Sequence, residues 1–104
     1  IVEPESANCL QQSINCGAIT SIEGPISNMG RLDCKEPSML AFDILKAGAN
    51  RFVTITDEQA EGARKMLHNH GISTTTSGAA GLAYLMHSSF PSNARPLIIV
   101  TETR

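Results

Sequence analysis

The sequence predicts an α/β protein with a mostly parallel sheet in three layers, carrying helices on both faces. Short runs of β-branched and apolar residues alternate along the chain with segments of helical spacing, and this alternation implies right-handed crossovers between parallel strands. The last such run, Leu97-Ile98-Ile99-Val100, is apolar on both sides, as a central parallel strand would be. A length of 104 residues fits one domain spanning 1–104.

Four strands are expected. The chain opens on an apolar pair, Ile1-Val2, that suits the end of a buried strand. Residues 19–23 alternate between apolar and polar, and Gly24-Pro25 ends the alternation. Phe52-Val53-Thr54-Ile55 is rich in β-branched residues. Together with residues 97–100, these runs would form the sheet.

Four helices are expected between and after these strands. Thr56-Asp57-Glu58-Gln59 is a capping box and is the strongest local signal in the chain. The other helix starts carry residues that suit a first turn or an N-cap. The expected starts are Ser6, Pro37, Thr56 and Ser77, and the expected ends are Gly17, Gly48, 69–71 and the residues after Met86.

Composition excludes several classes of partner. The net charge is −2, and the sequence contains no Trp and one Tyr, so neither a nucleic acid nor a membrane surface is expected to bind. No apolar run approaches the length of a transmembrane span. The three cysteines lack metal-binding spacing, which favours reduced thiols in a cytoplasmic protein.

The sequence offers no obvious reactive group. The three histidines fall near expected helix ends, and no cluster of His, Cys and Asp has the spacing of metal ligands. Lys46 and Lys65 lie on expected helix surfaces, and none of the lysines sits where a desolvated amine nucleophile is expected. We therefore assign no catalytic residue and no metal ligand to this chain.

The stretch from Ile72 to Ala83 combines hydroxyl side chains with a Gly- and Ala-rich helix start. Such a start turns backbone N–H groups toward a space and leaves room for an anion or a cofactor ring. The alternative is a well-capped helix that packs tightly on the sheet. The carboxyl ends of parallel strands meet at one sheet edge, so Glu3, Asp57 and Thr101 are expected to lie there as well.

Six segments occur in the order found in one family of enzymes. They are Ile1-Val2-Glu3-Pro4, the Ala7/Cys9/Ser13 pattern, residues 32–38, Asp57 with Gly62-Ala63-Arg64, residues 77–82 and Val100-Thr101-Glu102. Together they resemble the C-terminal part of fold-type II, tryptophan synthase β-like pyridoxal-phosphate enzymes. The chain is most similar to diaminopropionate ammonia-lyase, and more distantly to serine and threonine dehydratases.

The resemblance implies pyridoxal 5'-phosphate as cofactor, a small amino-acid substrate and α,β-elimination to a 2-keto acid and ammonia. It places Thr101 or Ser77 at the pyridine nitrogen, with Thr101 preferred, and Gly78 beside the cofactor. Some relatives bind a divalent metal through residues matching Glu3 and Ala7, but Cys9 replaces the expected Asp, so no metal is predicted. The family's Thr-Glu-Gly becomes Thr101-Glu102-Thr103 here.

The resemblance also implies that the Schiff-base lysine and the glycine-rich phosphate loop come from an N-terminal part of the enzyme. We therefore expect a fragment that is inactive alone and that pairs with the remainder of its own catalytic domain in a homodimeric enzyme. Two alternatives remain. One is a fragment of a serine/threonine dehydratase or threonine synthase, and the other is a stand-alone regulatory module that binds a small anion.

Overall fold

The computed structural model describes residues 1–103 and contains two strands and four helices. Strand β1 spans Val2–Pro4 and is followed by helices α1, Cys9–Cys16, and α2, Met39–Gly48. Strand β2, Val53–Ile55, leads directly into α3, Asp57–Asn69, and α4 spans Ala80–Met86.

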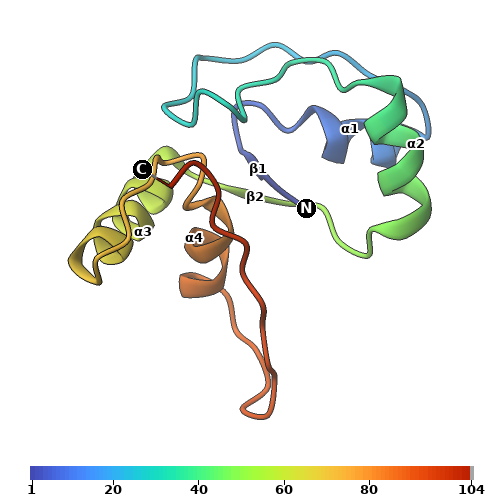
Figure 1. Ribbon diagram of the computed structural model, residues 1–104. Helices are drawn as coiled ribbons and strands as arrows, with labels where there is room; N and C mark the ends of the chain where they lie inside the picture. Colours follow the sequence, from blue (N-terminus) through green and yellow to red (C-terminus); the bar gives the residue numbers. More distant parts are fainter. Residues whose placement is uncertain (104) are drawn as a thin grey trace.

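The two strands pair in parallel, with Val2 opposite Val53 and Pro4 opposite Ile55. Figure 1 shows α3 and α4 on one side of the strand pair, and α1 and α2 on the other. Helix α4 packs against both strands and against α3. The α/β prediction with parallel strands is thus confirmed, within a smaller sheet than expected.

The hydrophobic core lies between β2, α3 and α4. Small residues on the facing sides of the two helices allow close packing, and Met29 fills the remaining space from the loop before α2. The completely buried Met29 belongs to a segment without sequence periodicity, so its role was not predicted. The buried core residues are Met29, Ile55, Ala60, Ala63, Leu67, Ala79, Ala80 and Ala83.

The start of α3 agrees with the sequence prediction. The Thr56 hydroxyl accepts a hydrogen bond from Gln59 N at 3.1 Å, and the Gln59 side chain accepts one from Thr56 N at 3.0 Å. This reciprocal pair satisfies two N–H groups that a helix start otherwise leaves without intrahelical partners. The capping box fixes the direction in which the chain leaves β2.

The start of α1 differs from the prediction that Ser6 caps it. The helix begins at Cys9, and the Glu3 carboxylate accepts hydrogen bonds from Leu10 N at 2.8 Å and Gln11 N at 2.9 Å. A carboxylate at a helix N-terminus interacts favourably with the helix dipole. This contact joins β1 to α1 across a turn, so no local pattern around Ser6 could reveal it.

Two other helix starts also lie later than predicted. Helix α2 begins at Met39 with Ser38 as its N-cap, so Pro37 precedes the first turn. Helix α4 begins at Ala80, because Thr76–Ala79 form a separate turn before it. Ser77 does not cap this helix, since its hydroxyl accepts a hydrogen bond from Arg31 N at 3.1 Å.

Two predicted strands are absent from the described part of the chain. Residues 19–23 follow the α1 C-cap at Gly17 in an irregular conformation, held by hydrogen bonds between Ser13 and Thr20 and from Ile22 N to Lys35 O. Residues 97–100 are not hydrogen-bonded to either strand of the sheet. Within the described residues, Ile98 lies beside Gly81 of α4, whereas Leu97 and Ile99 are largely exposed.

Candidate functional site

The candidate site lies where the turn before α4 meets the end of the chain. We call Thr74–Gly78 the hydroxyl turn and Thr101–Thr103 the C-terminal tail. The Thr74 hydroxyl donates a hydrogen bond to the Thr101 carbonyl at 2.6 Å. Gly78 N donates to the Thr75 hydroxyl at 3.1 Å, which closes the turn on itself.

Gly78 is required by the closeness of this contact. A Cβ atom at this position would overlap both the Thr101 carbonyl and the Thr74 hydroxyl. Only glycine therefore lets the tail lie against the hydroxyl turn without displacing it. The arrangement fixes the Thr101 backbone while its side chain remains exposed.

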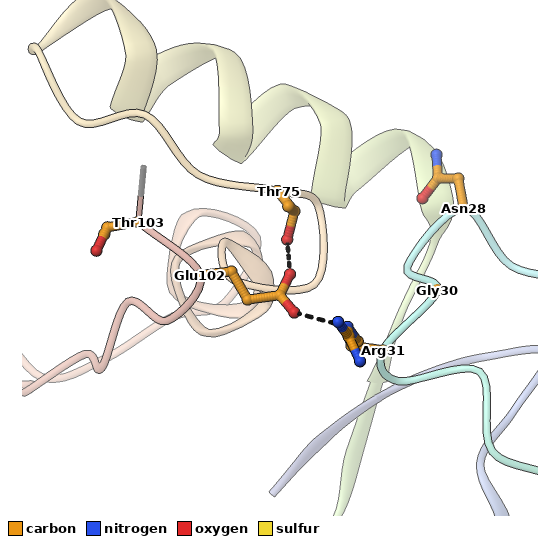
Figure 2. A pocket seen from close by; sticks show the side chains of 6 residues that line it. All are labelled: Asn28, Gly30, Arg31, Thr75, Glu102 and Thr103. Atoms are coloured by element: carbon orange, nitrogen blue, oxygen red, sulfur yellow. Dashed lines mark hydrogen bonds and ion pairs between the residues drawn. The ribbon is translucent and has the colours of Figure 1, made fainter.

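Glu102 fastens the tail at a second point. Its carboxylate accepts a hydrogen bond from the Thr75 hydroxyl, and the other oxygen lies 3.3 Å from Arg31 Nε. Figure 2 shows Glu102 between these two partners. Its φ of 57° lies in the left-handed region, which costs a non-glycine residue about 1–3 kcal/mol. The two contacts hold the backbone in that conformation.

The loop around residues 27–31 completes the arrangement. Asp57, at the start of α3, accepts hydrogen bonds from the Ser27 hydroxyl at 2.5 Å and from Asn28 N at 2.8 Å. The Thr76 hydroxyl donates to Asn28 O at 2.8 Å. This loop therefore connects the carboxyl end of β2 to the hydroxyl turn.

These three segments surround an open hollow of about 690 Å³. Its lining is mostly polar and comes from the loop, the turn and the tail: Asn28, Gly30, Arg31, Thr75, Glu102 and Thr103. The paired charges of Arg31 and Glu102 cross it (Figure 2). A hollow with hydroxyls, a carboxylate and a guanidinium suits a small polar ligand.

The three predicted site residues have different surroundings in the structure. Thr101 is exposed, and no described residue hydrogen-bonds to its hydroxyl. Ser77 is 9% exposed and points toward the loop at Arg31. Gly78 lies in van der Waals contact with the tail backbone. None of the three lines the hollow itself, which begins one residue after Thr101.

Glu3 lies elsewhere than expected. It belongs to β1, and its carboxylate faces the first turn of α1 rather than the hollow. Burial raises the pKa of Glu3 above its ordinary value of 4.5, and the hydrogen bonds from Gln11 N and Leu10 N partly offset that rise. Residues 1–103 contain no group of three or more His, Cys, Asp and Glu side chains that could hold a metal.

Sequence reasoning missed most of the lining. Arg31 and Asn28 lie in a loop without periodicity, and Glu102 was assigned no partner. The hydroxyls of Thr74 and Thr75 were a usable signal, because consecutive hydroxyl residues before a glycine often hydrogen-bond to nearby backbone. Their partners, Thr101 and Glu102, are each 27 residues away along the chain, so these contacts depend on the fold.

Among residues 1–103, no helix has both the length and the apolar character needed to cross a bilayer. All three cysteines are free thiols.

Comparison with known proteins relates the chain to characterised sequences. It is 35% identical over 91 residues to "Diaminopropionate ammonia-lyase" of Escherichia coli K12, an alignment that covers 82% of this chain and 23% of that protein. The same identity and coverage hold for the protein of that name from Escherichia coli O157:H7. The chain therefore spans about a quarter of the length of these relatives.

Solved structures show the same fold. A threonine deaminase from the organism abbreviated T.th. superposes with a TM-score of 0.77 at 24% identity, covering 83% of this chain and 32% of the other. An L-serine ammonia-lyase from Rhizomucor miehei superposes with a TM-score of 0.73 at 17% identity, covering 99% and 36%. Maize serine racemase gives a TM-score of 0.69 at 24% identity, covering 80% and 27%.

These neighbours have the tryptophan synthase β-like fold. A family model described as "Pyridoxal-phosphate dependent enzyme" matches residues 1–102, nearly the whole chain. The chain belongs to the pyridoxal-phosphate dependent enzymes of the tryptophan synthase β-like fold.

Proposed function

We propose that this chain is the C-terminal part of the catalytic domain of an ammonia-lyase that eliminates ammonia from a small, diaminopropionate-like amino acid. The observation that carries the proposal is that the Thr101 backbone is held in place while its side chain is exposed. Its carbonyl is fixed by Thr74, while its hydroxyl has no partner among the described residues and faces solvent. The 35% identity to diaminopropionate ammonia-lyase supports the choice of reaction.

The residues present fit one part of pyridoxal phosphate. A pyridine nitrogen needs a hydrogen-bond partner. The Thr101 hydroxyl can donate one hydrogen bond and can also accept hydrogen bonds. Gly78 supports this fit, because a side chain there would displace the tail that carries Thr101. The Ser77 hydroxyl already accepts a hydrogen bond from Arg31 N and is buried, so we favour Thr101 at the ring nitrogen.

Pyridoxal phosphate, when bound, supplies the electron sink that α,β-elimination requires. In the proposed site, Thr101 orients the ring and brings no formal charge to its nitrogen. Thr74 and Gly78 hold the Thr101 backbone, and Glu102 with Thr75 and Arg31 prevents the tail from moving away. A neutral hydroxyl leaves the ring nitrogen largely unprotonated, in contrast to a carboxylate partner.

The lysine side chains of this chain lie near other residues of the same chain. Lys35 Nζ donates to Ser6 O at 2.7 Å, Pro25 O at 2.9 Å and Asp33 Oδ1 at 2.7 Å. Lys46 lies over the Phe42 ring, and Lys65 lies near Glu61. In this proposal the lysine that would hold the cofactor comes from another part of the catalytic domain, so the isolated chain is inactive.

Substrate profiling of the full-length polypeptide tests the proposal. The purified protein, loaded with pyridoxal phosphate, is incubated separately with diaminopropionate, serine and threonine, and the 2-keto acid is quantified. We expect diaminopropionate to give the highest kcat/KM. A clear preference for serine or threonine would instead identify a dehydratase. No keto acid from any of the three would reject the lyase proposal.

The stand-alone anion-binding module is distinguished by the gene. A reading frame that encodes a lysine-bearing segment and a glycine-rich loop upstream of Ile1 supports the enzyme, whereas a start codon at Ile1 supports the module. We further propose a cytoplasmic location, which the free thiols support. A homodimer of the full-length polypeptide is also part of the proposal, and light scattering of the purified protein measures it.

A further inference from the structure

Residues 25–33 form a loop whose two ends meet at one side-chain atom. Lys35 Nζ donates hydrogen bonds to the Pro25 carbonyl at 2.9 Å and to Asp33 Oδ1 at 2.7 Å. A short surface loop whose ends lie together in this way is typical of compact Ω-loops. The 25–33 loop carries three of the residues that line the polar hollow: Asn28, Gly30 and Arg31 (Figure 2).

The same ammonium group reaches the turn between β1 and α1. Lys35 Nζ donates a third hydrogen bond to the Ser6 carbonyl at 2.7 Å. Gly24 permits this approach, because a Cβ atom there would lie only 2.6 Å from the Ser6 carbonyl oxygen. All three N–H donors of the ammonium group therefore have oxygen partners. Lys35 thus ties both ends of the 25–33 loop to the turn after β1.

The three oxygen atoms around Lys35 Nζ are ligands of the kind that hold a monovalent cation. Two are main-chain carbonyls and one is a carboxylate, at 2.7, 2.9 and 2.7 Å from the nitrogen. Main-chain carbonyls replace the hydration shell of potassium in protein sites. The hydrogen bond from Lys35 holds the pKa of Asp33 below its ordinary value of 3.8, so this carboxylate is charged at neutral pH.

The other two lysines have different surroundings. Lys46 Nζ lies 5.6 Å from the centre of the Phe42 ring, and Lys65 Nζ lies 3.9 Å from a Glu61 oxygen. Both side chains are exposed, as is usual for a solvated cation. These two lysines are therefore controls for any general effect of removing a positive charge.

We propose that Lys35 is a positioning residue whose own ammonium group fills a monovalent-cation site between the ends of the 25–33 loop. By holding both ends against the turn after β1, it fixes the backbone that brings Asn28 and Arg31 to the hollow. An ordinary surface ion pair needs only two charged side chains, whereas two of the three ligands here are carbonyls. Without the Lys35 side chain, the three oxygens can bind a free ammonium or potassium ion.

Cation rescue of Lys35→Ala in the full-length polypeptide tests the proposal. In tetramethylammonium chloride, whose cation is too bulky for the site, we expect a lower urea midpoint than in the unsubstituted protein. Amide exchange in residues 26–32 should be faster by more than about tenfold. Ammonium or potassium chloride at the same ionic strength should reverse most of both changes, because a bound ion stabilises the folded state.

Two further variants show whether the rescue is specific. Lys46→Ala should respond equally to all three salts, since its ammonium has no oxygen ligands among the described residues. Asp33→Asn combined with Lys35→Ala should lose the rescue, because a neutral amide does not balance the charge of the ion. No difference among the salts in Lys35→Ala, or the same difference in Lys46→Ala, would overturn the proposal.

The unsubstituted protein offers a test that does not depend on the folding of any variant. Trace labelling with an amine-reactive ester, read by mass spectrometry, compares the lysines with one another. The side chains of Lys35 and Lys65 are 30% and 67% exposed, so exposure alone accounts for about a twofold difference. We expect Lys35 to react more than about tenfold more slowly, since its three hydrogen bonds must break first. A difference of only twofold would overturn the proposal.

The cation site goes beyond the proposed function, and none of these measurements requires catalysis. If the full-length polypeptide is a lyase, potassium should also restore kcat in Lys35→Ala, and potassium is used because ammonium is a product of the reaction. Cation rescue of folding in a polypeptide without lyase activity would reject the proposed function and retain the site. Lyase activity without any cation response in Lys35→Ala would retain the function and overturn the site.

Discussion

Thr101 and Ser77 differ in what the fold leaves each hydroxyl free to do. Thr101 is held by its carbonyl, and its side chain is exposed, whereas the Ser77 hydroxyl is buried against the Arg31 backbone. Two hydroxyls that resemblance alone placed as alternatives therefore have different surroundings. Those surroundings favour Thr101 at the ring nitrogen and give Ser77 a part in holding the loop at Arg31.

Replacing each hydroxyl in the full-length polypeptide tests this assignment. We expect Thr101→Ala to lower kcat about tenfold, since one hydrogen bond to the cofactor corresponds to about 1.4 kcal/mol. Ser77→Ala should lower it by less than about threefold. Thr101→Ser restores the hydroxyl and should restore most of kcat together with the cofactor absorbance spectrum. A larger loss for Ser77→Ala would move the ring contact to Ser77.

Gly78→Ala probes the contact between the hydroxyl turn and the tail. The added methyl group would overlap the Thr101 backbone, so we expect a loss of about 1–3 kcal/mol in the free energy of unfolding measured with urea. Gly62→Ala in α3 is the matched control. Its Cβ would meet no atom within 4 Å, and alanine should stabilise the helix by about 0.5–1 kcal/mol. Equal effects of the two substitutions would contradict the close contact.

The raised pKa of Glu3 should make the stability of the folded chain depend on pH. Its pKa in the folded chain lies above 4.5, chiefly because of burial, so the folded chain holds this proton to higher pH than the unfolded chain does. The Glu3 contribution is complete below pH 4.5 and is lost as pH rises through the folded pKa. Urea midpoints across pH 4 to 7 should show this decrease, and Glu3→Gln should flatten it. An unchanged slope in Glu3→Gln would assign it to other groups.

Among the helices and strands, the capping box of α3 is the local feature with the clearest energetic consequence. Thr56→Ala removes the hydroxyl that accepts from Gln59 N and should cost about 1 kcal/mol of unfolding free energy. Ser73→Ala is the control, because Ser73 is exposed and makes no hydrogen bond to the described residues through its side chain. A loss as large in Ser73→Ala would argue against a specific capping contribution.

The same elements show how far the sequence determines the fold. Both partners of the α3 capping box lie within four residues, so the pattern predicts the contact correctly. The first turn of α1 is capped by Glu3, which is seven residues before Leu10, and the local pattern pointed to Ser6 instead. Residues 97–100 have strand-like alternation, but a strand also needs a neighbour, and the described residues supply none.

The candidate site was predictable to a similar extent. The hydroxyl turn and Thr101 could be named because their residue types carry a chemical role. Arg31 and Glu102 could not, because their contact joins residues 71 positions apart, and only the folded loop brings them together. The exposed Arg31 side chain has no sequence feature that separates it from other solvated cations.

For the molecule as a whole, we propose that the chain provides one wall of a catalytic domain. It belongs to a pyridoxal-phosphate family and spans 23% of a relative's length. Large apolar side chains such as Ile26, Leu40 and Leu97 are 88%, 72% and 90% exposed. Such exposure is unusual in a domain that functions alone, and it agrees with the proposal that further parts of the catalytic domain cover these surfaces.

We propose that this wall supports elimination only when the rest of the catalytic domain supplies the amine. The direct test is a pyruvate assay with diaminopropionate and pyridoxal phosphate, run in parallel on the purified 104-residue chain and on the full-length polypeptide. We expect pyruvate and ammonia from the full-length polypeptide and none from the chain alone. Pyruvate formation by the chain alone, or no pyruvate from the cofactor-loaded full-length polypeptide, would contradict this proposal.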